Sequence, residues 1–273
     1  MKSIKARTQE QWSKIPIGTE TTGFESFHER FSREYFDDHS RFRFGVYAPW
    51  LPKLAGFEEF AGKNILEVGC GMGTDLLEYA KGGARVTGLD LTPRHIELSM
   101  KRFKMFGQWG NFLIGDAECL PFPDQSFDFV YSNGVLHHTP RTQVAADEIH
   151  RVLKPGGQAL VLLYHKFSLV YYLSIMLKSG SKRFVRHLLS RKPLSEFSLE
   201  RVLSTSTDGN ENPLTKVYTR REGQSLMRRF SNVSTEVVHL MKGDFPLSSV
   251  FPSSLLEWLS GRMGWYLVLR GNK

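Results

Sequence analysis

A glycine-rich segment and an acidic residue farther along form the pattern in this sequence with the clearest chemical meaning. A short apolar run at 65–68 predicts a buried strand, and Gly69, Gly71 and Gly73 follow it. Glycine lets the backbone turn sharply and approach a ligand that side chains would block. Asp90, at the end of the next apolar run, has the offset of a carboxylate that accepts hydrogen bonds from both hydroxyls of a ribose. The pair predicts a ligand that contains a nucleoside.

The residues after the glycines separate the classes of nucleoside ligand. A dinucleotide fingerprint needs glycine or a very small residue at position 74, where Thr74 stands. No Lys-Ser or Lys-Thr follows the glycines, so the segment is not a phosphate-binding loop. The structural alternative is a glycine turn that only joins a strand to a helix, and the paired Asp90 argues against it.

A second group of residues could move protons. His137 and His138 follow one expected strand, and Tyr164 and His165 lie at the end of the next. Histidine titrates near neutral pH, which suits a general base. The histidine pair could instead cap the following helix or shape a pocket.

These residues need a framework in which strands alternate with helices. Strands are expected at 65–68, 86–91, 111–117, 127–135 and 159–164, with a helix at 141–153 and a turn at 154–157. A helix that begins with a Thr219/Glu222 capping box precedes a sixth strand at 236–241, and a seventh is expected at 265–269. Such alternation implies a parallel sheet with right-handed crossovers.

The ordered motifs resemble the class I S-adenosylmethionine-dependent methyltransferases, in particular the type 11 group. The similar segments are E-x-G-x-G-x-G from Glu67, LPFPDQSFD at 120–128, VLHH at 135–138 and RVLKPGG at 151–157. Together they cover about residues 60–165 and form a specific set. The resemblance implies an α/β fold: a Rossmann-like seven-stranded sheet, six strands parallel and the seventh antiparallel, with an N-terminal helical cover and an insertion after strand five.

The same resemblance implies which residues would bind S-adenosyl-L-methionine. Asp90 would take the ribose hydroxyls, Asp116 the adenine amino group, and Glu67 would orient the loop or meet the ammonium through water. Each acid could instead cap a helix or lie at the surface. The full set expected at the cofactor is Glu67, Gly69, Cys70, Gly71, Gly73, Asp90, Leu91, Asp116, Ala117 and Asn133, with Tyr35 or Arg43 at the methionine carboxylate.

In that family the methyl group leaves a sulfonium by in-line displacement, so positioning supplies most of the acceleration. An oxygen, nitrogen or thiol acceptor also loses a proton to a base. The candidates for catalysis are His138, which we prefer, with His137 and Tyr164.

Length and composition fit one catalytic domain with elaborations. The chain has 273 residues, 41% of them apolar and 23% charged. We expect a cover at 1–60, a cofactor-binding core at 61–165, a basic and apolar insertion at 166–218 that acts as a substrate lid, and the rest of the core at 219–273. No secretory h-region, membrane span or metal-ligand spacing is recognised, so the expected location is the cytoplasm.

The net charge of +8 is concentrated in one part of the chain. Residues 178–229 contain twelve Lys or Arg against five Asp or Glu. An apolar stretch at 167–177 precedes this region and leads into a basic amphipathic pattern at 182–189. The segment 167–192 could therefore contact an anionic membrane surface or admit a hydrophobic substrate. The structural alternative is a lid that packs on the core and exposes a basic face to solvent.

The N-terminal cover contains aromatic residues at three- and four-residue steps. Phe24, Phe27, Phe31, Tyr35 and Phe36 are interpreted as a stripe on one helix that serves packing.

Three function classes follow. The first is a methyltransferase that acts on a small, hydrophobic metabolite. The second is an RNA methyltransferase, which the basic segment favours, although Ser-Asn-Gly-Val at 132–135 stands where base amino-group methylation requires Asn/Asp-Pro-Pro-Tyr. The third is a non-catalytic protein that binds the cofactor and regulates a partner. No DNA partner is expected.

Overall fold

The computed structural model describes residues 3–14, 16, 24–190, 198–207 and 212–273. Seven strands carry the site. They are β1 (Asn64–Val68), β2 (Arg85–Asp90), β3 (Asn111–Ile114), β4 (Phe127–Asn133), β5 (Leu153–Tyr164), β6 (Ser231–Val238) and β7 (Tyr266–Asn272).

Helices connect and cover these strands. The α-helices are α1 (Ile4–Lys14), α2 (Arg33–Phe42), α3 (Leu51–Ala55), α4 (Thr74–Lys81), α5 (Pro93–Met105), α6 (Thr142–Val152), α7 (Ser181–Leu189), α8 (Leu199–Ser204), α9 (Arg220–Leu226) and α10 (Ser253–Met263). Shorter or differently wound helices are η1 (Arg43–Tyr47), η2 (Leu136–His138), η3 (Val170–Gly180) and η5 (Ser248–Val250).

The strands form one sheet in the order β3-β2-β1-β4-β5-β7-β6. The pairs among β1 to β5 are parallel, whereas β7 pairs antiparallel with both β5 and β6. Six strands therefore share one direction and β7 opposes them, which confirms the expected fold class. The chain order switches between β1 and β4, and ligands of open α/β sheets bind at the carboxyl end of such a switch point.

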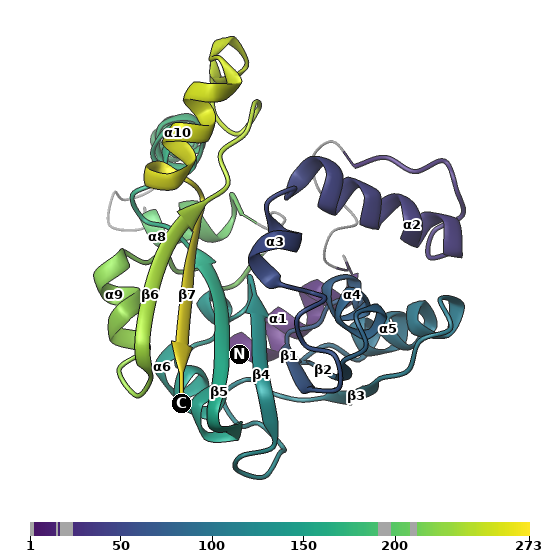
Figure 1. Ribbon diagram of the computed structural model, residues 1–273. Helices are drawn as coiled ribbons and strands as arrows, with labels where there is room; N and C mark the ends of the chain where they lie inside the picture. The colour runs from purple at the N-terminus through teal and green to yellow at the C-terminus, as the bar shows by residue number, and fades with distance from the viewer. Residues whose placement is uncertain (1–2, 15, 17–23, 191–197, 208–211) are drawn as a thin grey trace.

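Both faces of the sheet are buried, because successive side chains of a strand point to opposite sides. In β5, Ala159, Val161 and Leu163 join one hydrophobic cluster, while Leu160 and Leu162 join another. Helices α6 and α9 pack on the first face, and α3 and α4 on the second. Figure 1 shows α2 and α3 above one half of the carboxyl edge of the sheet and α10 above the other half.

Several expected strand boundaries are wrong. β3 ends at Ile114 instead of residue 117, and β4 ends at Asn133 instead of residue 135. Ile114 is the partner of Asp90, the last residue of β2, so β3 has no neighbour to continue along. β6 and β7 also lie differently from expectation, at Ser231–Val238 and Tyr266–Asn272, because β6 pairs with β7 from Ser231 onward.

The Lys-Pro-Gly-Gly sequence is part of β5 and not a turn before it. Leu153 pairs with Phe127, and the register then shifts before the ladder resumes. The amide of Gly156 donates to the carbonyl oxygen of Lys273 at 3.0 Å, and the amide of Lys273 donates to Gly157 at 2.9 Å. The end of the chain thus supplies partners that no local pattern reveals.

The aromatic stripe of the cover does not lie on one helix. Only Tyr35 and Phe36 belong to α2, which begins after the side chain of Ser32 caps it. Phe31 has a φ of 64°, a left-handed conformation that no α-helix contains. Phe24 and Phe31 still pack against Tyr35 and Phe36, whereas Phe27 is fully exposed.

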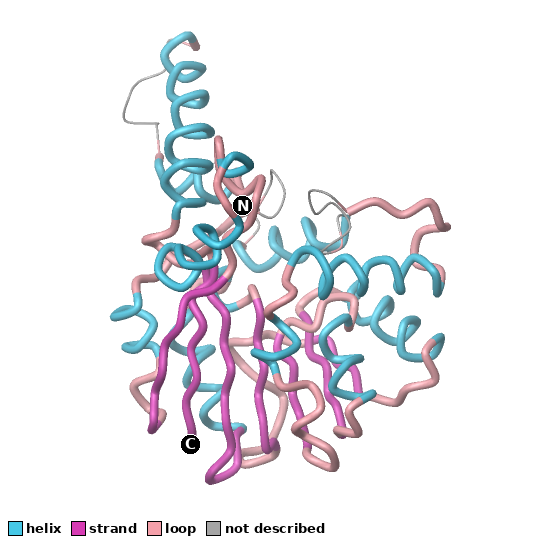
Figure 2. The backbone as a smooth tube through the Cα atoms, turned by 45° about the horizontal axis from the view of Figure 1, so that its top comes forward, coloured by secondary structure: helices cyan, strands magenta, loops and turns pink. Residues whose placement is uncertain are grey.

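The insertion after β5 begins with η3, whose wide turns continue directly into α7. Figure 2 shows these two elements as one long helix that extends beyond the rest of the molecule. No helix in the part of the chain that the structure describes is long and apolar enough to cross a membrane.

The capping box that opens α9 is present, as expected. The amide of Glu222 donates to Thr219 Oγ1 at 3.2 Å, and the amide of Thr219 donates to Glu222 Oε2 at 2.7 Å. We expect Thr219→Ala to lower the free energy of unfolding by about 1 kcal/mol, because one amide loses its acceptor. Urea titration measures this loss. Thr219→Ser keeps the hydroxyl and should retain most of the stability; an equal loss in both variants would contradict the capping role.

Candidate active site

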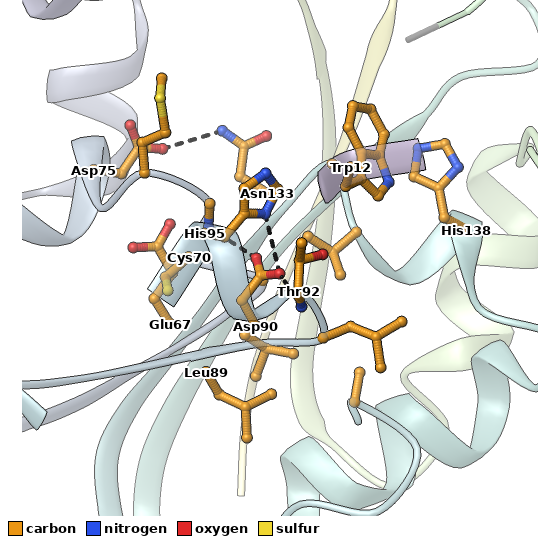
Figure 3. A pocket seen from close by; sticks show the side chains of 18 of the residues that line it. Trp12, Glu67, Cys70, Asp75, Leu89, Asp90, Thr92, His95, Asn133 and His138 are labelled. Atoms are coloured by element: carbon orange, nitrogen blue, oxygen red, sulfur yellow. Dashed lines mark hydrogen bonds and ion pairs between the residues drawn. The ribbon is translucent and has the colours of Figure 1, made fainter. Parts of the chain in front are cut away.

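A cavity opens at the carboxyl ends of β1, β2 and β4, at the switch point of the sheet (Figure 3). The core supplies its floor, and α1, α2 and η1 supply the cover. Of the residues expected at the cofactor, those that line it are Arg43, Glu67, Gly69, Cys70, Gly71, Asp90, Leu91, Asp116, Ala117 and Asn133. Of the candidates for catalysis, His138 and Tyr164 line it.

The glycine loop bends around the ends of β1 and β2. Gly69, Gly71 and Gly73 all have positive φ angles. At Gly69 a β-carbon would lie 2.2 Å from Val135 Cγ2, so any side chain would collide with the turn after β4. The amides of Gly69 and Cys70 donate to the carbonyl oxygen of Leu89, at 2.6 and 3.1 Å. The loop is therefore closely packed against its neighbours.

Asp90 is the acidic centre of the cavity. Its Oδ2 accepts from the amide of Gly71 at 3.0 Å, and its Oδ1 accepts from the amide of Thr92 at 2.8 Å and contacts His95 Nδ1 at 3.1 Å. Figure 3 shows the bonds to Thr92 and His95. Burial raises the pKa of Asp90, but the interaction with His95 and the hydrogen bonds from the two amides outweigh burial and lower the pKa below its ordinary value. The group is held as a carboxylate.

The end of the cavity beside β3 is closed by α1. Lys5 forms ion pairs with Asp116 and with Glu118, a carboxylate whose side chain is fully buried. Gln9 Nε2 donates to the carbonyl oxygen of Leu91 at 2.9 Å. The ring of Trp12 lies 6.4 Å from that of His95 and 6.3 Å from that of His138 (Figure 3). Helix α1 thus spans the cavity from its acidic end to the candidate base.

A buried ion pair forms the opposite end. Arg43 Nε and Nη2 donate to the two oxygens of Asp75, at 2.5 and 2.6 Å. Tyr131 donates to the same carboxylate at 2.8 Å and Asn133 Nδ2 at 3.3 Å. Burial raises the pKa of Asp75, but the charge and hydrogen bonds of Arg43 outweigh burial and lower it. This end therefore presents both signs of charge.

Two polar atoms of the lining have no hydrogen-bond partner among the described residues. They are Glu67 Oε2, at the end of β1, and Thr92 Oγ1, just after β2. Burial, and then the negative charge of Asp75, raises the pKa of Glu67 well above its ordinary value and favours the uncharged acid. Buried polar groups without partners are rare, and at a cavity they indicate a ligand that supplies the missing bonds.

His138 is positioned by the chain that returns from the insertion. Its Nδ1 lies 2.7 Å from the carbonyl oxygen of Leu214. A carbonyl oxygen can only accept, so this shorter contact favours the tautomer with its proton on Nδ1 and its lone pair on Nε2, whereas Asn212 Nδ2, a donor, lies 3.1 Å from the same Nδ1. The ring centroid of Tyr164 lies 3.9 Å from that of His137 and 4.3 Å from that of Trp265. These contacts fix the wall of the cavity beside His138.

Four expected site residues do not line the cavity. Tyr35 is buried in the aromatic cluster of the cover, which corrects its assignment to the methionine carboxylate. Gly73 caps α4 and supports the loop from behind. His137 is completely buried, and burial lowers its pKa well below the ordinary value, so its ring is neutral. His165 Nδ1 contacts the carbonyl oxygen of Gly264 instead of the cavity.

Comparison with known proteins identifies the core. Residues 66–161 match the family model of a methyltransferase domain. A probable phthiotriol/phenolphthiotriol dimycocerosates methyltransferase of Mycobacterium ulcerans is 43% identical over 101 residues, which are 36% of this chain and 38% of that protein. Residues 66–161 thus resemble the methyltransferase domains of known proteins.

Further comparisons agree with this resemblance. A sterol 4-C-methyltransferase of Caenorhabditis elegans is 37% identical over 100 residues, which are 36% of this chain and 30% of that protein. The match thus spans well under half the length of either relative. A solved S-adenosylmethionine-dependent methyltransferase of Thermotoga maritima has the same fold, with a TM-score of 0.52 and 19% identity over 89% of this chain and 98% of that one.

The lining of the cavity fits S-adenosyl-L-methionine. Glu67 Oε2 lacks a partner near the charged Arg43 and Asp75, where an ammonium and a carboxylate would find complementary groups. Thr92 Oγ1 also lacks a hydrogen-bond partner, and it lies near Asp90, where the hydroxyls of a sugar would find complementary groups. The two unpaired atoms thus lie where the amino acid moiety and the ribose of that molecule would supply partners.

Sequence reasoning missed Lys5, Trp12, Asp75 and His95. Asp75 follows the glycine loop directly, and this adjacency could have indicated it, but an acid in the first turn of a helix is common. His95 stands five residues after Asp90, within reach once a helix begins at Pro93. Lys5 and Trp12 come from a separate helix, and no local pattern places them at the cavity.

The Arg43–Asp75 pair yields a stability test. Arg43→Met leaves the buried carboxylate without its cation, so we expect the free energy of unfolding to fall by about 3–5 kcal/mol. Adding Asp75→Asn should recover part of the loss. The exposed pair Arg41–Asp38 provides the control, because Arg41→Met should cost at most about 1 kcal/mol. Urea titrations of the four proteins measure this, and equal losses at both arginines would refute it.

Proposed function

We propose that this protein transfers the methyl group of S-adenosyl-L-methionine to a small, hydrophobic acceptor. The observation that carries the proposal is the cavity at the switch point, with the charged Asp90 in the middle and the Arg43–Asp75 pair at one end. Bound there, the cofactor would supply an activated methyl group on a sulfonium.

The residues of the cavity support a definite orientation of the cofactor. Asp90 binds the ribose, and because three donors already occupy its oxygens, one of them moves aside when both hydroxyls bind. Glu67 and Asp75 meet the ammonium and Arg43 the carboxylate, with the backbone of Gly69, Cys70 and Gly71 along the methionine chain.

The adenine lies at the end beside β3 in this orientation. Leu91 packs against its face, Ala117 offers its amide, and Asp116 accepts from the amino group. Asp116 is paired with Lys5, so adenine recognition requires Lys5 to share that carboxylate or to rely on Glu118 alone. The backbone carbonyl of Asn133 faces the ammonium.

His138 is the proposed base for acceptors that lose a proton. With the proton on Nδ1, the tautomer that the carbonyl oxygen of Leu214 favours, Nε2 carries the lone pair. His137 is too deeply buried to reach an acceptor and acts by packing against Tyr164 and His138. Tyr164 lines the acceptor side, where its ring orients the substrate.

The class of acceptor follows from the wall of the cavity and from the relatives. Aromatic side chains from the cover and the core line the cavity, and they are Trp12, Phe42, Tyr47, Tyr164 and Tyr266. Such rings favour an apolar or aromatic substrate. Similar proteins are named for methylation of dimycocerosates, sterols and demethylmenaquinone, which are hydrophobic compounds.

Location and further partners extend the proposal. A cytoplasmic location and peripheral contact of residues 167–192 with a membrane remain predictions. The long helix of η3 and α7 supports membrane contact, because it extends away from the sheet and carries exposed apolar side chains.

The ribose anchor provides the test of the cofactor. Asp90→Asn removes the charge that strengthens two hydrogen bonds to the ribose, so we expect S-adenosylhomocysteine to bind about a hundredfold more weakly. Isothermal titration calorimetry measures the affinity. Glu58→Gln removes one exposed negative charge outside the cavity and should leave the affinity unchanged. Unaltered binding by Asp90→Asn would refute the assignment of this carboxylate.

The proposed base gives a second test. His138→Ala should lower methyl transfer by about 10²–10⁴-fold and leave S-adenosylhomocysteine binding intact, because the ring acts on the acceptor and not on the cofactor. Transfer of labelled methyl groups into the lipid, RNA, protein and small-metabolite fractions of an extract measures activity. The exposed His28→Ala is the control. Undiminished transfer would remove His138 from the mechanism, and labelled RNA would replace the proposed acceptor class.

A further inference from the structure

Exposed apolar side chains gather in one region of the molecule. The large hydrophobic residues that are exposed in the described part of the chain number sixteen, and ten of them lie between positions 167 and 258. These ten are Phe167, Tyr172, Leu177, Phe184, Val185, Leu189, Leu247, Val250, Leu255 and Trp258. A cluster of exposed apolar groups indicates an interaction site more strongly than scattered single residues do.

The long helix of η3 and α7 carries the first part of this cluster. Its second half exposes Leu177, Phe184, Val185 and Leu189, the last of which is 79% accessible. Because this helix extends beyond the body of the molecule, no part of the described fold covers these side chains (Figure 2).

A second element meets the helix at its base. Phe245 and Leu256 pack against Leu173 in a buried cluster, and Ser174 Oγ donates to the carbonyl oxygen of Asp244 at 2.5 Å. Around this base, η5 and α10 expose Leu247, Val250 and Trp258, each more than half accessible. Leu247 has a φ of 68°, an unfavourable conformation that keeps a 74% accessible leucine in the solvent.

The charge of the stretch that contains η3 and α7 has one sign, whereas the segment 247–258 contains one acid, Glu257. The sequence from 167 to 192 contains six Lys or Arg and no Asp or Glu. Lys182 and Arg186 of α7 are exposed beside Phe184 and Val185. On this helix the apolar side chains are interleaved with cations and no acid, which complements a surface that has negative headgroups above an apolar interior.

We propose that η3, α7 and the segment 247–258 form a docking surface for a bilayer that contains anionic lipid. The cations bind the headgroups, and the apolar side chains enter the boundary between headgroups and acyl chains. α10 rises from the carboxyl edge of the sheet, the edge at which the cavity opens (Figure 1). A docked protein therefore holds its cavity near the membrane, and the part of the inference that concerns a lipid-borne acceptor rests on the proposed function.

The experiment is sedimentation of the full chain with vesicles. We expect binding to vesicles of phosphatidylcholine mixed with phosphatidylglycerol, and much weaker binding to phosphatidylcholine alone or at high salt. Lys182→Gln with Arg186→Gln should weaken the partition coefficient about thirtyfold, since each cation near an anionic surface contributes about 1 kcal/mol.

Apolar insertion needs its own variant and control. Phe184→Ser with Leu189→Ser should weaken vesicle binding at least tenfold, because two apolar side chains that would be buried in the bilayer are lost. Trp109→Ser with Ile114→Ser changes two exposed apolar residues outside this region and should leave binding unchanged. Equal effects of the two pairs, or no sedimentation of the unaltered chain with anionic vesicles, would overturn the proposal.

Calorimetry with S-adenosylhomocysteine keeps this result separate from the cofactor assignment. The docking variants should bind the nucleoside like the unaltered chain, which also shows that they fold. Vesicle binding without any cofactor affinity would support the docking surface and refute the proposed function. If the unaltered chain instead forms dimers that Phe184→Ser with Leu189→Ser dissociates, and does not bind vesicles, the surface is an interface between copies and the membrane proposal is wrong.

Discussion

The buried ion pair of Arg43 and Asp75 joins the two parts of the chain on which the site depends. Arg43 comes from the cover, outside the segment that matches the methyltransferase family, and Asp75 lies in the first turn of α4, after the glycine loop. A buried carboxylate without a cation costs free energy of folding, so the pairing of Asp75 with Arg43 holds the cover against the core. In the proposed binding mode the same pair meets the ammonium and the carboxylate of the cofactor, which would link the stability of the fold to cofactor binding.

The core and the segments added to it both contribute residues to the cavity. The core supplies the loop, Asp90 and the edge of the sheet, and it contains the segment that matches the methyltransferase family model. Helix α1 and the insertion after β5 lie outside the family match, yet Trp12 reaches the cavity and Leu214 orients His138. Because a fold can host many reactions, we propose that these added segments select the acceptor.

Local patterns predicted the core well because its residues interact with near neighbours in sequence. The apolar runs of β4 and β5, the glycine turn and the capping box at Thr219 are all short-range features. Predictions were less accurate where a distant segment decides the outcome. β5 begins earlier than predicted because Lys273 pairs with Gly156 and Gly157. The spacing of the aromatic residues predicted one helix for Phe31 and Tyr35, but the two side chains meet in a cluster although only Tyr35 lies on α2.

The sequence by itself determined the family of the core, the type of ligand and most of the residues along the cavity floor, because strand ends and glycine turns are encoded locally. Only the tertiary structure decided that Arg43 and not Tyr35 reaches the cavity, that His137 lies behind His138, and that α1 brings Lys5 to Asp116. Those outcomes depend on how separate elements pack and which charges become buried together. Such packing follows from the whole chain and leaves no periodic pattern within any one segment.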